Sequence, residues 1–538
     1  MKTSAQTALK LGIVFYITFL MACSPRMRNN EGKISEEYMK KDMPMVVEQD
    51  EGIVSPVVTD DFEKPEENFN TEAYDKITEN QFVAVVNNPL STFSVDVDRA
   101  AYANVRRYLT GNSLPPQDAV RIEEMINYFD YSYPQPTGTN PFSVTMEMST
   151  CFWNTNHYLV SIALQGKNVD VSKLPASNLV FLIDCSGSMS DENKLPLLKQ
   201  SFKILMDELR PEDKVAIVVY AGAAGLALQS TTCTKDNLDK IVNAFDKLEA
   251  GGSTAGGEGI ELAYKIATDN FIKGGNNRVI LATDGDFNVG MSSDAAMERL
   301  IEQKRESGVF LTVLGFGMGN YKDSKMEKLS NAGNGNYAYI DNILEAKKTL
   351  GKEMWGTLFT IAKDVKLQIE FNPAKVKAYR LIGYENRMLN KEDFNDDKKD
   401  AGDIGSGHSV TAFYEIIPSN SKEEVKGVDE LEYQKLTSVT SDNMMTVKLR
   451  YKEPDGTESK LITHKVKDSD ILKASPSENF MFASSVIEFG LLLRKSELKG
   501  NAGYKQLIDR AKLAKGTDTE GYRSEFIKLA ETAQLLSK

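Results

Sequence analysis

One stretch in the first half of the chain decides the fold: Leu179-Val180-Phe181-Leu182-Ile183-Asp184-Cys185-Ser186-Gly187-Ser188-Met189. Its first five residues form a continuous apolar run, which is typical of a strand covered on both faces of a parallel sheet. Asp184, Ser186 and Ser188 then place an acid and two hydroxyls on alternate residues. An extended turn points such residues in one direction. The stretch therefore predicts a buried strand that ends in a cluster of oxygen atoms.

Beyond this stretch, strand and helix patterns alternate as far as residue 340. Buried strands are predicted at 215–220, 279–282, 310–314 and 337–340, with a short edge strand at 226–229. The helices predicted between them are 195–209, 237–248, 259–270, 295–306 and 325–331. This alternation indicates a mainly parallel, doubly wound α/β sheet with right-handed crossovers. We therefore predict an α/β domain over residues 176–345.

Two further polar groups join the Asp184 loop if the sheet has the common strand order 3-2-1-4-5-6. Asp284 follows the strand at 279–282, and Thr254 lies in a glycine-rich loop. In that order the first and fourth strands are neighbours, and ligands bind in the crevice at their carboxyl ends. Carboxylate and hydroxyl oxygens suit a hard cation, and Mg²⁺ usually takes only one or two carboxylates. The predicted ligands are Asp184, Ser186, Ser188, Thr254 and Asp284.

These five residues resemble the metal-ion-dependent adhesion site of von Willebrand factor type A domains. The family's pattern is Asp-x-Ser-x-Ser after the first strand, a Thr in a later loop and an Asp after the fourth strand. The resemblance implies a bound Mg²⁺, with Mn²⁺ or Ca²⁺ as alternatives, and a protein partner whose acidic side chain completes the coordination. It implies no established enzymatic activity. Ser253 precedes Thr254 where many relatives have Gly, so Ser253 replaces Thr254 as ligand if the loop is shifted by one residue.

Residues 82–175 predict a smaller α+β region before the α/β domain. The alternation at 93–97 predicts a half-buried strand. Asp98 follows it at the expected N-cap of a helix, because a short acidic side chain accepts hydrogen bonds from the first helical amides. A second helix is predicted over 118–129.

After the α/β domain, residues 346–470 return to alternating β segments. We expect these segments to pair with those of 82–175 in one antiparallel sandwich, and residues 471–538 to be helical. Residues 88–98, 118–129 and 403–411 resemble a bacterial lipoprotein subfamily of type A domain proteins.

The first 22 residues predict a signal peptide. An uncharged apolar run at 11–22 is too short to span a bilayer and has the length of a signal-peptide core. It ends in Leu20-Met21-Ala22-Cys23, which resembles the bacterial lipobox, where cleavage precedes a Cys that is then acylated. The alternative is an ordinary secretory signal with a chance Cys.

Residues 23–81 are polar, acidic and without periodicity, so we expect a disordered tether. Together with lipidation of Cys23, this predicts an extracytoplasmic protein of the bacterial cell envelope. A lipid anchor would hold it at the outer membrane or the cell surface.

Composition excludes several classes of function. The 538 residues carry a formal charge of −13, and loss of the two lysines of the signal segment would make it −15. Such an acidic chain argues against nucleic acid as a partner. Three histidines and four cysteines leave little room for a His-rich zinc site, a His-based triad or a disulfide scaffold.

Two enzyme hypotheses fit poorly. Residues 315–319, Gly-Phe-Gly-Met-Gly, follow the fifth strand of the domain rather than the first, so we expect no dinucleotide. A serine hydrolase at Ser186 or Ser188 lacks a nearby His and the Gly-x-Ser-x-Gly elbow. The stronger alternative to an adhesion protein is a structural scaffold whose metal is only stabilising.

Five other residues are expected to be structural or stay undecided. Asp286 is expected to face a turn, Cys185 to be buried beside its strand and His408 to be structural. Cys151 and Cys233 either pair or stay free, and the sequence does not decide between these states.

Overall fold

The computed structural model describes residues 72–95, 98–252, 256–285, 294–425 and 441–538. The predicted signal peptide, Cys23 and the predicted tether up to residue 71 lie outside the described residues. Within the described ranges, no helix combines the length and the apolar content needed to cross a membrane.

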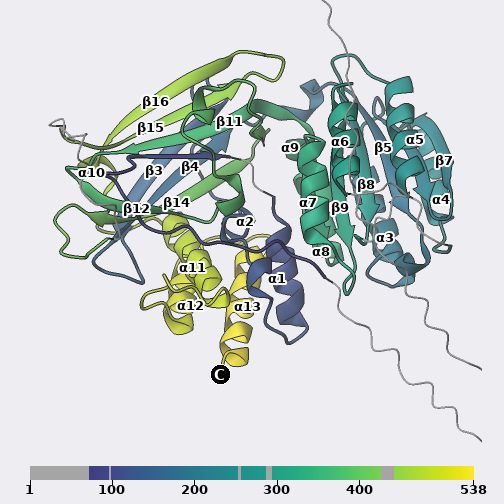
Figure 1. Cartoon of the computed structure of the whole chain (residues 1–538). Helices are drawn as coiled ribbons and strands as arrows, with labels where there is room; N and C mark the ends of the chain where they lie inside the picture. The colour runs from purple at the N-terminus through teal and green to yellow at the C-terminus, as the bar shows by residue number, and fades with distance from the viewer. Residues whose placement is uncertain (1–71, 96–97, 253–255, 286–293, 426–440) are drawn as a thin grey trace, which may run out of the picture. The chain divides into compact units, whose positions relative to one another are not determined.

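The central domain is a six-stranded sheet in the order β10-β9-β8-β5-β6-β7 (Figure 1). All neighbours pair in parallel except β7, which runs antiparallel at the edge. This is the 3-2-1-4-5-6 order, so the predicted doubly wound α/β fold is confirmed and β5 lies beside β8. The strands are β5 (Ser177–Asp184), β6 (Lys214–Tyr220), β7 (Ala224–Thr232), β8 (Asn276–Thr283), β9 (Phe310–Phe316) and β10 (Tyr337–Ile340).

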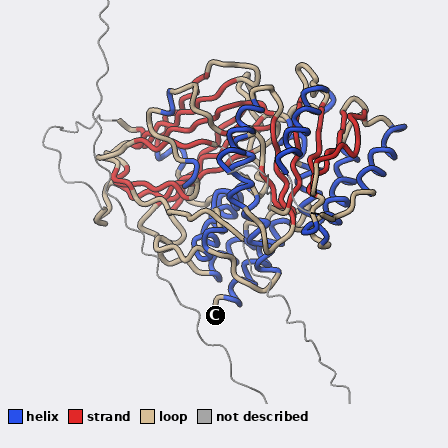
Figure 2. The backbone as a smooth tube through the Cα atoms, turned by 45° about the vertical axis from the view of Figure 1, so that its right-hand side comes forward, coloured by secondary structure: helices blue, strands red, loops and turns tan. Residues whose placement is uncertain are grey.

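Helices cover both faces of this sheet (Figure 2). Phe181 of β5 packs against Phe202 on one face, whereas Leu182 shares a core with Ile260 on the other. Because successive side chains of a strand point to opposite faces, a strand covered twice needs the unbroken apolar run seen in the sequence. α3 (Leu195–Glu208) and α4 (Lys235–Asp246) cover the first face, and α5 (Gly256–Asp269), α6 (Asp294–Arg305) and α7 (Asp323–Ala332) the second.

Two antiparallel sheets are built from chain on both sides of the central domain. The first has the order β1-β12-β14-β4-β3, and in the second β13-β11-β15-β16 is joined by β2 at β11. Because β4 pairs with β14 and β2 with β11, the central domain is an insertion between strands of one sandwich. The strands are β1 (Val83–Ala84), β2 (Leu90–Ser94), β3 (Phe142–Thr150), β4 (Tyr158–Gly166), β11 (Thr360–Phe371), β12 (Val376–Ile382), β13 (Gly402–Gly405), β14 (Ser409–Pro418), β15 (Asn443–Lys452) and β16 (Ser459–Lys467).

The remaining helices form a third packed region. Leu159 and Phe413 of the first sheet share a core with Phe482 and Phe526 of these helices and with Phe129, which follows α2. The helices are α1 (Ala100–Thr110), α2 (Ile122–Asn127), α11 (Glu478–Leu493), α12 (Tyr504–Leu513) and α13 (Tyr522–Leu536). Short helices α8 (Ile343–Ala346) and α9 (Met354–Leu358), with a π-helix at Lys347–Lys352 between them, lead to β11, and α10 (Asp468–Ile471) follows β16.

Two local expectations are corrected. Asp98 does not cap α1, whose N-cap residue is Arg99; it accepts hydrogen bonds from Tyr337 N at 3.0 Å and Arg387 Nη2 at 3.1 Å. A buried carboxylate gains more from a cation than from a cap. The helix predicted at 118–129 is divided at Arg121, which has an extended backbone and directs its guanidinium to Asp323.

Residues 72–81 fall within the predicted tether, yet they contact the folded part of the chain. The Glu72 carboxylate accepts hydrogen bonds from Tyr108 Oη at 2.6 Å and Gly319 N at 2.8 Å, besides an ion pair with Arg107. Farther along, Asn80 Nδ2 donates to Gly383 O at 2.9 Å. These contacts are polar, so they leave no hydrophobic periodicity in the sequence, and the described fold begins at residue 72.

Candidate metal site

The carboxyl ends of β5 and β8 bring the two predicted acidic ligands together. Ile183 pairs with Ala282 in parallel register, so Asp184 ends one strand where Asp284 follows the other. Both aspartates have 0% exposed surface. The strand order therefore places two carboxylates at one edge of the sheet, as expected at a topological switch point.

The two serines lie on the turn after β5. Ser186 N donates to Asp184 Oδ1 at 2.9 Å, which folds the turn back over the aspartate. The hydroxyl oxygens of Ser186 and Ser188 are 3.1 Å apart. Two oxygens bound at right angles to one Mg²⁺, each at roughly 2.1 Å, would stand about 3.0 Å apart. Ser186 is buried and Ser188 is exposed, so the set opens to solvent through Ser188.

Asp184 is held by hydroxyl donors from the neighbouring strands. Tyr220 Oη and Thr283 Oγ1 donate to Asp184 Oδ2 at 3.0 and 3.2 Å. Burial raises the pKa of Asp184 above its ordinary value, the nearby Asp284 carboxylate adds to the rise, and the hydrogen bonds of Ser186 oppose it. These contacts fix the side chain at the sheet edge.

Asp284 has the opposite electrostatic surroundings. Although burial alone would raise the pKa of this carboxyl, a hydrogen bond from Asn320 and the ammonium of Lys194 hold it below its ordinary value. Asn320 Nδ2 is 2.9 Å and Lys194 Nζ is 3.1 Å from Asp284 Oδ2. Lys194 Nζ also donates to the Ser188 carbonyl oxygen at 2.9 Å.

Lys194 and Asn320 were not among the predicted site residues. Lys194 is only 4% exposed, although a lysine just before a helix is expected in solvent. Neither residue belongs to the Asp-x-Ser-x-Ser pattern, and a contact between them spans 126 positions of sequence. Only the three-dimensional neighbours of Asp284 reveal them.

Thr254, its alternative Ser253, and Asp286 lie outside the described residues. The two glycines before Ser253 are bound to the serine turn: Gly251 N donates to Cys185 O at 2.8 Å, and Gly187 N donates to Gly252 O at 3.1 Å. The described donors are thus two carboxylates and two hydroxyls. This all-oxygen set suits Mg²⁺, Mn²⁺ or Ca²⁺ rather than zinc. Among the described residues, no cluster of three or more His, Cys, Asp or Glu side chains could hold a metal ion.

Other residues singled out in the sequence lie away from this edge or are engaged elsewhere. Gly319 N is bound by Glu72. In the described part of the chain, neither Ser186 nor Ser188 has a histidine partner. The thiols of Cys151, Cys185 and Cys233 are buried and free.

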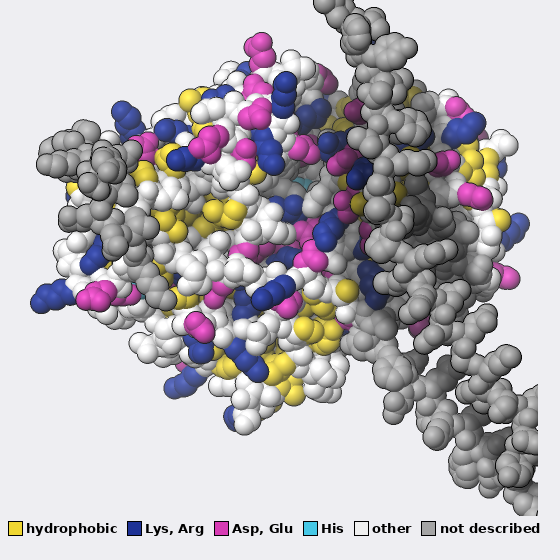
Figure 3. Space-filling model, viewed as in Figure 1, with side chains coloured by type: hydrophobic (Ala, Val, Ile, Leu, Met, Phe, Trp, Pro, Cys, Tyr) yellow, Lys and Arg dark blue, Asp and Glu magenta, His cyan; other side chains and the backbone are white. Residues whose placement is uncertain are grey.

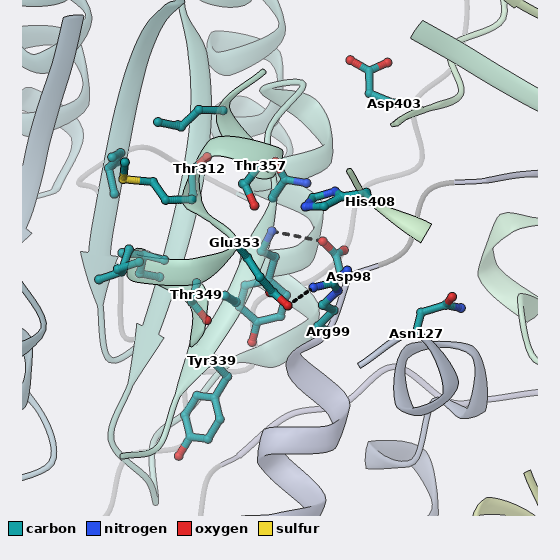
Figure 4. Close-up of a pocket in the computed structure, with 18 of the residues that line it drawn as sticks. Asp98, Arg99, Asn127, Thr312, Tyr339, Thr349, Glu353, Thr357, Asp403 and His408 are labelled. Carbon is teal, nitrogen blue, oxygen red and sulfur yellow. Dashed lines mark hydrogen bonds and ion pairs between the residues drawn. The ribbon is translucent and has the colours of Figure 1, made fainter. Parts of the chain in front are cut away.

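His408 lines a small pocket between the central domain and the sandwich, with a volume of about 90 Å³ (Figure 4). Burial lowers the pKa of His408 to about 4, so its ring is neutral at pH 7. In the same pocket Arg99 and Glu353 point toward one another and form an ion pair of 2.5 Å. The pocket is smaller than most ligand sites, and its central charges are paired.

The match to a family model agrees with the architecture of the central domain. Residues 178–351 match the von Willebrand factor type A domain family, residues 68–161 match a family described as von Willebrand factor, and residues 356–536 match one described as "Uncharacterized protein YfbK, C-terminal". The chain is 45% identical over 477 residues to the protein YfbK of Escherichia coli strain K12, covering 87% of this chain and 82% of that protein. It is 28% identical over 174 residues to mouse inter alpha-trypsin inhibitor heavy chain 4, covering 31% of this chain and 18% of that protein. A solved structure described as von Willebrand factor type A from Catenulispora acidiphila is 14% identical, covers 86% of this chain and 98% of that chain, and has a TM-score of 0.39.

Proposed function

Because this chain belongs to the family of the bacterial protein YfbK and its residues 178–351 match the von Willebrand factor type A domain family, we propose that it is a binding protein without catalytic activity. In this proposal Asp184, Ser186, Ser188, Thr254 and Asp284 hold a divalent cation, and a protein partner contributes a carboxylate. The observation that carries it is the convergence of the two buried aspartates with the paired serine hydroxyls at one edge of the sheet.

The residues at the carboxyl ends of β5 and β8 supply too little negative charge to neutralise a divalent cation fully. The site offers two carboxylates, and Lys194 already neutralises part of Asp284. A group from outside the protein would reach the site past Ser188, which is exposed. A bound divalent cation would supply an open coordination position for that group.

The charge of the whole chain works against an acidic partner. On the face drawn in Figure 3, acidic and basic side chains are intermixed over the visible surface. The chain nevertheless carries −13 in total. Attraction of a carboxylate must therefore come from the site itself, within the Debye length of about 8 Å at physiological salt.

We also propose that Cys23 is the lipidated first residue of the exported protein. The apolar run and Leu20-Met21-Ala22-Cys23 support this assignment. Two or more acyl chains give a stable anchor, which would hold the protein in the cell envelope outside the cytoplasm. Mass spectrometry of detergent-extracted protein tests it: acyl mass on Cys23 is expected, and an intact Met1 would contradict it.

A scaffold whose metal only stabilises is the second candidate. Buried ion pairs support it, because Arg106 joins α1 to Asp341 and Glu345 of the central domain. Such contacts hold the central domain against the helices, as a structural role would require.

One experiment separates the two functions. Partners are captured from envelope extract by the whole protein in Mg²⁺ or in EDTA, and again with Asp284→Ala and with Asp269→Ala. Asp269 is an exposed aspartate of the same domain, paired with Lys265, and serves as the matched control. We expect capture in Mg²⁺ by the wild type and Asp269→Ala alone, with Mg²⁺ affinity in calorimetry reduced more than about 100-fold by Asp284→Ala. Equal capture in all conditions would favour the scaffold.

A further inference from the structure

At the amino end of β8, the opposite end from Asp284, a buried arginine makes no ion pair with a described residue, and the carboxylate that acts on it, Asp403, does so without direct contact. Arg278 is 2% exposed. Its Nη1 donates to Thr312 Oγ1 at 2.6 Å, and this is its only hydrogen bond to a described residue. Its Nε is buried without a partner, and no described carboxylate forms an ion pair with it.

Leaving this guanidinium unpaired is energetically costly. A charged group that is moved out of water destabilises the fold unless an opposite charge compensates for its lost hydration. Burial lowers the pKa of Arg278 to about 10, so the side chain still carries its charge at pH 7. The missing partner is an anion.

A polar cavity of about 280 Å³ lies beside Arg278. Its size is close to the lower limit of small-molecule sites, roughly 300 Å³. Within the described structure, the side-chain amides of Asn331 and Asn336 have no hydrogen-bond partner and are only partly exposed. The donors that line the cavity include Arg278, Asn331, Asn336, Asn386, Arg387 and Lys399.

The charges around the cavity indicate how much negative charge a ligand would carry. Arg387 is already paired with Asp98 and Glu327. On the acidic side, Asp400 is paired with Arg305 at 3.1 Å, while Asp403 also lines the cavity. The carboxylates of Asp400 and Asp403 would repel a ligand with two negative charges. A ligand with one negative charge is enough to pair with Arg278.

We propose that this cavity binds a small organic molecule through one carboxylate group. A carboxylate suits the guanidinium of Arg278, because arginine binds carboxylates through parallel, charge-assisted hydrogen bonds. Asn331 and Asn336 come from the central domain and Asn386 from the sandwich, so a bound ligand contacts both. The proposal is independent of the metal site, since β8 separates the two places.

Acetate is the simplest probe of this site. The full chain is heated in increasing acetate, with chloride added to keep the ionic strength constant, and its midpoint of thermal unfolding is followed. We expect a saturable rise in the midpoint for the wild type and for Arg299→Met, which removes an exposed arginine of the same domain. Arg278→Met should abolish the rise.

A second variant decides the question if Arg278→Met does not fold. Asn336→Asp adds a fixed carboxylate to the cavity, which should pair with Arg278 and abolish the acetate response. An acetate response that persists in the folded variants overturns the proposal. A phosphate response as large as the acetate response overturns the assignment to a single carboxylate.

Discussion

Two regions of the molecule bury an arginine in opposite surroundings. Where α2 meets α7, Arg121 is bound to Asp323 and lies 3.0 Å from Glu327 and 3.3 Å from Glu124. At the amino end of β8, Arg278 forms no ion pair with a described acid, and Asp403 acts on it without direct contact. Both side chains are at most 4% exposed. The contrast shows that burial alone does not assign a role, because the first arginine is in direct contact with three acids, whereas the second contacts none.

The largest expected effect comes from breaking the paired arrangement. Arg121→Met leaves Asp323 and Glu124 buried close together without their cation, and leaves Glu327 with Arg387 alone. Removing one partner of a buried pair costs about 3–5 kcal/mol, so the free energy of unfolding should fall by that amount. Urea unfolding measures it. Arg299→Met is the matched control and should change the stability by less than about 0.5 kcal/mol; a similar small change in Arg121→Met would contradict the argument.

A third buried cation, Lys194, has a predicted metal ligand as its partner. Its ammonium is 3.1 Å from Asp284, so a divalent cation on that carboxylate would be repelled at short range. Even at the dielectric constant of water, two unit charges 4 Å apart interact by about 1 kcal/mol, and a divalent ion doubles this. Lys194→Met should therefore raise the Mg²⁺ affinity about tenfold or more.

Calorimetry of Lys194→Met and Lys203→Met makes this measurement. Lys203 lies on α3, which begins just after Lys194, but it is exposed and paired with Asp246, so its loss should leave the affinity unchanged. A weaker affinity in Lys194→Met would mean that the lysine mainly positions Asp284.

The fold of the central domain was predictable because its signal is local. The apolar run at 179–183 and the alternation that follows it reflect burial on both faces of each strand. Such burial requires an apolar side chain at every position of the strand. No local sequence pattern specifies which strands pair in the two outer sheets. Which edge of β11 receives β2 depends on contacts between segments that are far apart in the chain.

The candidate site was predictable to the extent that its residues form a motif. Asp184, Ser186 and Ser188 are spaced by the turn itself, and Asp284 follows from the strand order. Lys194 and Arg278 could not be found in this way. Their roles depend on what surrounds them: a buried lysine needs the Asp284 carboxylate, and an unpaired arginine is defined by the carboxylates that are missing.

A smaller change of opposite sign is expected at the unpaired arginine. Without a ligand, Arg278→Met removes a buried charge and keeps most of the apolar volume. Replacement of buried charges by apolar groups of similar size is often neutral or stabilising, so we expect a gain of about 1 kcal/mol in the free energy of unfolding. Urea unfolding in chloride buffer measures it, and a loss of several kcal/mol would place Arg278 with Arg121 as a structural cation.

The smallest expected effect concerns a buried charge that can be switched by pH. His157 lies 2.5 Å from Glu415 through Nδ1 and 2.8 Å from Glu423 through Nε2. Although burial alone would lower it, the hydrogen bonds to these two glutamates raise the pKa of His157 above 6.5 in the folded protein. Glu415 is also bound by Arg380 at 2.7 Å and by Trp153 Nε1 at 3.1 Å, so it keeps partners when the histidine is neutral.

A folded-state pKa above the unfolded one means that His157 stabilises the fold fully below about pH 6.5, and that this contribution is lost as the pH rises through the raised value. The urea midpoint of the wild type should therefore fall between pH 6 and pH 9 by more than that of His157→Gln, which cannot take up the proton. His464 of β16 serves as the control, because burial lowers the pKa of His464 and His464→Gln should leave the pH profile above 6.5 unchanged. If the profiles of the wild type and His157→Gln run parallel over this range, His157 is neutral in the fold and the paired state inferred for it is wrong.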